Sequence, residues 1–132
     1  MVQYETEGQV ADRLRHHDVV VLSPHGEIDL ETAPLLREAL LPVLERETGP
    51  VVLDLSEVAF MDSTGVHLLV EALRRLELQN RRLAIVCREG GQVHRLLAVV
   101  GLLDVLTVHC SRESGVAGGD ERLRPEPNVA TV

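Results

Sequence analysis

The chain has 132 residues, of which 45% are hydrophobic, and this length and composition fit one compact domain with a single core. Thirteen basic residues against 21 acidic ones give a formal net charge of −8, the wrong sign for binding a phosphate backbone, so nucleic acid is excluded as a partner. Tyr4 and Phe60 are the only aromatic residues and no lysine is present, which excludes base-stacking surfaces, P-loops and Schiff-base chemistry.

Four further features concern location and cofactors. Cys87 and Cys110 are far apart in the sequence and form no CxxC motif, and adjacent His16 and His17 point to opposite faces if they lie in a strand. No signal peptide pattern opens the chain, and its apolar runs are far shorter than a membrane span. We therefore expect a cytoplasmic protein that has no membrane segment and uses no metal or cofactor.

The N-terminal part of the chain predicts two strands and a helix. Weak alternation over residues 1–12 indicates an edge strand, the charged segment 13–17 a polar turn, and the apolar segment 18–23 a buried strand. After a loop over 24–29, apolar residues at helical spacing predict a helix over 33–46. Thr32 is its expected N-cap residue, and Pro42 should kink it.

The central part continues this alternation of strands and helices. The β-branched run 51–55 is typical of a strand covered on both faces, and a loop over 56–62 should follow it. A helix is predicted to open at Ser63 or Thr64 and to run to Gln79-Asn80.

The C-terminal part predicts two more strands and one helix. A strand is expected over 82–87, a tight turn at Gly90-Gly91, a helix ending at Gly101, and a last strand over 105–109.

This order indicates an α/β fold: a single domain over 1–110 with a mixed, mainly parallel sheet, an N-terminal edge strand and helices packed on the sheet. From Ser111 the composition changes to glycine, proline and charged residues, with few apolar side chains to bury. We therefore expect residues 111–132 to form a mostly disordered tail.

The most informative motif for function joins a buried strand to a helix. It is Phe60-Met61-Asp62-Ser63-Thr64-Gly65, and it places a carboxylate and two hydroxyl groups at a helix N-terminus. The unpaired N–H groups and the positive end of the helix dipole favour an anion there, either a capping carboxylate or a phosphate on a side chain. From these residues alone, a plain helix cap and a modified side chain both remain open.

Five segments together resemble the bacterial anti-sigma factor antagonists, whose domain is called STAS. The resemblance covers residues 18 to 108 in the same order. The segments are Gly26-Glu27-Ile28-Asp29, 33–38, Val52-Leu53-Asp54-Leu55, 60–65 and Val100-Gly101-Leu102.

The resemblance implies a switch protein and not an enzyme. In the family, an anti-sigma factor that is itself a serine kinase phosphorylates the serine directly after the aspartate of the motif. That residue is Ser63 here, with Thr64 as the alternative. The unphosphorylated form would bind the kinase and free the sigma factor, phosphorylation would switch binding off, and a serine phosphatase would reset the switch.

The same resemblance implies the contact residues for the kinase. They are Glu27, Asp29, Asp62, Ser63, Thr64, Gly65 and His67. His67 stands where family members commonly carry a second glycine, so the approach of the partner over the first helical turn is altered.

Two other functions remain open from the sequence. The first keeps the fold: a stand-alone STAS module that senses a nucleotide or scaffolds a signalling or transport complex, with Ser63 only a helix cap. The second is a small hydrolase that uses Ser63 and Asp62 with a histidine. The sequence argues against the hydrolase because Ser63 lacks the GxSxG elbow and an adjacent aspartate cannot orient a base on the far side.

Overall fold

The structure is a computed structural model that describes residues 2–4, 11–16 and 18–119. Strands and helices alternate along most of it, as the sequence predicts. The strands are β1 Val2–Tyr4, β2 Ala11–His16, β3 Val19–Pro24, β4 Gly26–Ile28, β5 Val51–Asp54, β6 Val58–Met61, β7 Leu83–Val86 and β8 Thr107–His109. The helices are α1 Ala33–Arg46, α2 Ser63–Leu78, α3 Gln92–Val99 and α4 Arg112–Gly119.

Six of these strands form one mixed sheet in the order β1-β2-β3-β5-β7-β8. β2 is antiparallel to both β1 and β3, whereas β3, β5, β7 and β8 pair in parallel. The parallel pairs follow from the helices that connect them, because a parallel crossover needs a long connection. The prediction of an α/β domain with a mainly parallel sheet and an N-terminal edge strand is therefore confirmed.

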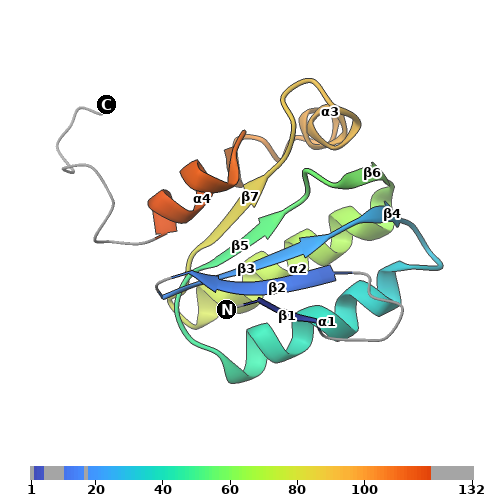
Figure 1. Ribbon diagram of the computed structural model, residues 1–132. Coiled ribbons are helices and arrows are strands. Elements are labelled where there is room, and N and C mark those ends of the chain that lie inside the picture. The colour runs from blue at the N-terminus through green and yellow to red at the C-terminus, as the bar shows by residue number, and fades with distance from the viewer. Residues whose placement is uncertain (1, 5–10, 17, 120–132) are drawn as a thin grey trace, which may run out of the picture.

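The helices divide between the two faces of this sheet (Figure 1). One face carries Val20, Leu22, Leu53 and Ile85, which pack with the buried sides of α1, α2 and α3 in the main core. On the other face, a smaller cluster of valines is covered by Val116 of α4. Both faces of the central strands are thus buried, which explains their uninterrupted apolar sequences.

The bounds of α1 confirm the helix predicted over 33–46, and the start of α2 confirms one of the two predicted start residues. α1 covers Ala33–Arg46 as predicted, with Pro42 inside it, and α2 begins at Ser63. The apolar residues at helical spacing in α1 and α2 form part of the core, because Leu36, Leu40 and Leu69 are each less than 5% exposed.

Three predicted loops or turns were wrong. The charged segment 13–17 is not a polar turn, since Ala11–His16 form β2; residue 17 lies outside the described residues. Arg13 and Arg15 are accommodated in this strand because both form ion pairs with Glu47 at the end of α1. The predicted loops 24–29 and 56–62 contain β4 and β6, which pair in parallel as a separate two-stranded sheet.

The expected disorder of the tail was wrong for Arg112–Gly119, which form α4. This helix packs against the sheet so closely that a Cβ atom on Gly115 would lie 2.9 Å from Cγ2 of Val86. Small residues that look unsuited to a helix are what allow this approach. Residues 120–132 lie outside the described residues, so the prediction for them stays untested.

No helix in the described part of the chain is both long enough and apolar enough to cross a membrane.

Candidate functional site

The motif at residues 60–65 forms the junction between β6 and α2. Asp62 is the N-cap residue in an extended conformation, and its Oδ1 accepts hydrogen bonds from the N–H of Thr64, at 2.9 Å, and from the Thr64 hydroxyl. Asp62 therefore caps the helix. The hydrogen bond from the Thr64 hydroxyl, which has the larger effect, and that from the Thr64 N–H lower the pKa of Asp62 below its ordinary value. Asp62 is therefore an anion at neutral pH.

Ser63 has a different environment from both of its neighbours. Its side chain is exposed, and in residues 2–4, 11–16 and 18–119 no hydrogen bond to its hydroxyl is found. Thr64 is half-buried and its hydroxyl is bound to Asp62. Of the two candidate hydroxyl groups, that of Ser63 is accessible and that of Thr64 is occupied.

The loop after β4 lies beside this junction. The register pairs Ile28 with Met61, and the N–H of Asp62 donates to the carbonyl oxygen of Ile28 at 3.1 Å. Asp29 directly follows β4 and Asp62 directly follows β6. The structure thus brings the segment of Glu27 and Asp29 next to the segment of Ser63.

Asp29 orders its own loop. Its Oδ1 accepts the N–H groups of Glu31 and Thr32, each at 3.0 Å, and the hydroxyl of Thr32 donates to the carbonyl oxygen of Glu27 at 2.6 Å. Thr32 occupies the N-cap position of α1, as predicted, but its hydroxyl makes no capping hydrogen bond to the helix. Its hydroxyl instead holds the loop against β4. Glu27 itself is exposed.

Gly65 is buried, and its missing side chain makes room for the core. A Cβ atom there would lie 2.4 Å from Cγ and 2.9 Å from Sδ of Met61, and 3.1 Å from Cγ2 of Ile28. The group that approaches the backbone of Gly65 is therefore Met61 of the same chain. His67 is exposed on the first turns of α2, four residues after Ser63 and on the same side of the helix.

Two large apolar side chains are exposed around this junction. Leu30 in the loop after β4 is 78% exposed, and Phe60 on β6, which pairs with Glu27, is 42% exposed. Leu30 lies one residue after Asp29, and Phe60 lies two residues before Asp62. The two segments that meet at this junction therefore carry both carboxylates and exposed apolar groups, a mixture typical of protein–protein contacts.

A residue that the sequence analysis missed supports this junction from α3. The side-chain amide of Gln92 donates to the carbonyl oxygen of Met61 and accepts its N–H, both at 2.9 Å. This pair of bonds fixes the backbone one residue before Asp62. No pattern in the sequence signals it, because the two residues are 31 positions apart.

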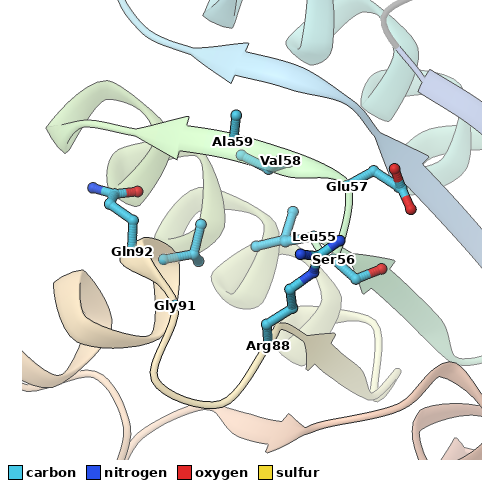
Figure 2. A pocket seen from close by; sticks show the side chains of 9 residues that line it. Leu55, Ser56, Glu57, Val58, Ala59, Arg88, Gly91 and Gln92 are labelled. Carbon is cyan, nitrogen blue, oxygen red and sulfur yellow. The ribbon is translucent and has the colours of Figure 1, made fainter.

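Gln92 also lines a pocket of about 290 Å³ between β6 and the start of α3 (Figure 2). In Figure 2, Arg88 extends toward Ser56 and Gln92 lies on the opposite side of the pocket. This volume lies just below the range of about 300–1,000 Å³ for small-molecule sites. Its lining has no aromatic side chain for stacking on a base, so the pocket gives the nucleotide-sensing alternative no support. The lining residues are Leu55, Ser56, Glu57, Val58, Ala59, Arg88, Gly91, Gln92 and Val93.

A second group that was missed ties α4 to the sheet. Asp54, 3% exposed at the end of β5, accepts a hydrogen bond from Nε of Arg112 at 2.8 Å, and Arg112 also donates to the Ser23 hydroxyl at 2.7 Å. Burial alone would raise the pKa of Asp54, but hydrogen bonds from the hydroxyl and N–H of Ser56 and from Arg112 lower it below its ordinary value. The ion pair is structural and anchors the first residue of α4.

Comparisons with known proteins agree with this architecture. Residues 11–115 match the model of the STAS domain. The anti-sigma-B factor antagonist of Staphylococcus epidermidis is 33% identical over 98 residues, which cover 74% of this chain and 90% of that protein.

Solved structures give the same result. The crystal structure of an anti-sigma factor antagonist from Mycobacterium paratuberculosis has a TM-score of 0.77 and 28% identity, and the match covers 83% of this chain and 92% of that one. The phosphorylated form of SpoIIAA from Bacillus has the same fold at 19% identity, with a TM-score of 0.62 and coverage of 94% of this chain and 100% of that one. The chain therefore belongs to the STAS domain family, among the anti-sigma factor antagonists.

Proposed function

We propose that this protein is a phosphorylation-controlled antagonist of an anti-sigma factor. The unphosphorylated form binds an anti-sigma factor that is a serine kinase, and the sigma factor is thereby freed. Phosphorylation of Ser63 by that kinase ends the binding. The observation that carries the proposal is that the Ser63 hydroxyl is exposed at a helix N-terminus while Asp62 does the capping, so Ser63 can be modified without loss of the cap.

The local electrostatics favour a change in binding over a change in folding. A phosphate adds a charge of about −1.5 to −2. The N–H groups and dipole of α2 tolerate this charge, whereas a partner surface pressed against Ser63 meets an anion that it must desolvate or repel beside the Asp62 carboxylate. A regulatory coupling of this kind amounts to about 1–3 kcal/mol, or roughly 5- to 150-fold in affinity.

The contact surface in this proposal is the exposed side of the junction. Glu27, Asp29, Asp62, Ser63 and His67 supply polar contacts, and the exposed Phe60 and Leu30 supply apolar area.

Two further residues complete the contact set in different ways. Thr64 contributes through its bond to Asp62. Gly65 is buried and contributes by allowing the first turn of α2 to pack on Met61.

The proposal includes three points beyond the contact itself. The protein acts as a binding partner and not as an enzyme, because the kinase supplies the phosphoryl transfer. A serine phosphatase restores the unmodified form. Both encounters take place in the cytoplasm.

Mapping of the phosphorylated residue tests the proposal. The purified chain is incubated with its anti-sigma kinase and ATP, and phosphopeptides are located by mass spectrometry in the wild type, Ser63→Ala and Thr64→Val. Thr64→Val is the matched control, because it keeps the shape of the threonine and leaves the Ser63 hydroxyl in place.

We expect phosphate on Ser63 in the wild type and in Thr64→Val, and none on residues 62–65 in Ser63→Ala. A chain that stays unmodified at Ser63 and Thr64 would instead support the alternative of a STAS module that senses a nucleotide or scaffolds a complex.

A further inference from the structure

The two cysteines, distant in the sequence, come together at the carboxyl ends of β7 and β8. The parallel register pairs Val86 with His109, and the N–H of Cys87 donates to the carbonyl oxygen of His109 at 3.0 Å. Cys87 and Cys110 directly follow this last residue pair and therefore lie opposite each other at the ends of the two strands. Neighbouring strands lie about 4.7–4.9 Å apart, within the range of about 4.4–6.8 Å between the Cα atoms of a disulfide.

The environments of the two thiols differ in a way that suits a two-step oxidation. Cys110 is exposed just after β8, and its Sγ lies 4.0 Å from Oε1 of Glu89, so it faces the turn that follows Cys87. Cys87 is only 1% exposed. Burial, together with the nearby Cys110, raises the pKa of Cys87 to about 11, so Cys87 is a protonated thiol at neutral pH. Cys110 is the thiol that an oxidant reaches first.

We propose that Cys87 and Cys110 form a reversible disulfide when the protein meets a hydroperoxide, and that this bond loosens the junction that carries Ser63. The sulfur of Cys110 attacks the peroxide, an S–O bond forms as the O–O bond breaks, and the leaving oxygen takes up the Cys110 thiol proton to depart as an alcohol or water. Cys87 then attacks the resulting sulfenic acid, an S–S bond forms, and the hydroxyl leaves as water with the Cys87 proton. Two thiols are oxidised, the peroxide is reduced, and a dithiol reductant reverses the reaction.

A short path connects this pair to Ser63. Four residues, 88–91, separate Cys87 from Gln92, and they form a turn closed by the bond from Gly91 N–H to the Arg88 carbonyl oxygen at 3.0 Å. Gln92 in turn holds the backbone of Met61 by two bonds of 2.9 Å. Asp62, the residue after Met61, is the N-cap of α2. The side chain of Gln92 therefore connects the turn over 88–91 to this N-cap.

The sheet order sets the direction of the effect. β8 lies on the side of β7 opposite to β5, whereas α3 packs against β6. Cys87 is packed in the main core whereas Cys110 is exposed, so bringing the two sulfur atoms together draws the start of the turn toward β8 and away from Met61. Only the importance of this junction for regulation rests on the function proposed above; the disulfide and the loosened backbone do not.

The test uses the purified full-length chain without any partner. The reduced protein is treated with hydrogen peroxide, its peptides are mapped by mass spectrometry without reduction, and amide hydrogen exchange is measured at Met61. We expect a peptide pair linked through Cys87 and Cys110 that lacks two hydrogen atoms and returns to the thiol form with dithiothreitol. Exchange at Met61 should become about two- to tenfold faster, as for the loss of one hydrogen bond.

The matched control is Cys110→Ser, which keeps the size of this exposed side chain and removes its sulfur. Its exchange at Met61 should not respond to peroxide. If peroxide over-oxidises Cys110 or links two chains, and no Cys87–Cys110 bond forms, the proposed disulfide is wrong. A disulfide that leaves Met61 exchange unchanged overturns the coupling. Because no kinase is present, either result is independent of whether Ser63 is phosphorylated.

Discussion

The side chain of Gln92 satisfies both backbone polar groups of Met61, with its amide nitrogen on the carbonyl oxygen and its amide oxygen on the N–H, each at 2.9 Å. Met61 is 1% exposed, so water cannot replace these bonds without a rearrangement. The position of α2, whose cap follows Met61, therefore depends on a residue in a different helix.

Gln92→Glu should destabilise the fold by about 1–3 kcal/mol at neutral pH, because the carboxylate presents an oxygen to the Met61 carbonyl in place of a donor. Urea unfolding of this variant and of Gln92→Ala measures the effect. Acidification restores a donor to the glutamate, so the deficit of Gln92→Glu should narrow at low pH while that of Gln92→Ala does not. A Gln92→Glu protein as stable as the wild type at neutral pH would show that the two bonds contribute nothing.

Gly65→Ala tests the close packing between α2 and β6. Alanine gains about 1 kcal/mol in helix propensity over glycine, but its Cβ would meet Cγ of Met61 at 2.4 Å in the core. Overpacking of this kind costs about 1–3 kcal/mol, so we expect a net loss of stability in urea unfolding. A more stable Gly65→Ala protein would mean that Met61 moves aside freely.

The Arg112–Asp54 pair should stabilise α4 in a pH-dependent way. Because the pKa of Asp54 is lowered in the folded state, the contribution of the pair is complete above the ordinary carboxyl pKa of about 4 and is lost as the pH falls through the lowered value. Arg112→Gln should cost about 1 kcal/mol near neutral pH, since the arginine is partly exposed. The cost should shrink below about pH 4. Urea unfolding of both proteins across this range checks it, and a cost that grows on acidification contradicts the assignment.

The sequence predicts those parts of the fold that have their own periodicity. α1 and the start of α2 follow from apolar spacing and helix-start residues, and β5 and β7 from short β-branched runs. β4 and β6 were missed because each is only three or four residues long and pairs only with the other. Such short strands have no pattern that distinguishes them from a loop.

The missed helix and the missed site residues have a common cause. α4 contains three glycines, and it is held by Arg112 on Asp54 and by the close approach of Gly115 to Val86, none of which is local in sequence. The motif at 60–65 revealed the position of the junction, because a strand end and a helix start are local features. It could not reveal that Asp62 is the cap or that Gln92 supports it, since these depend on side-chain geometry.

The affinity of the Ser63 variants for the anti-sigma kinase tests the central claim most directly. Ser63 is exposed, so Ser63→Ala and Ser63→Asp should each unfold within about 0.5 kcal/mol of the wild type, which serves as the folding control. Isothermal titration calorimetry should then show that Ser63→Ala binds like the unmodified protein. Ser63→Asp and the phosphorylated wild type should bind roughly 5- to 150-fold more weakly. Equal affinities for all four forms would contradict the account.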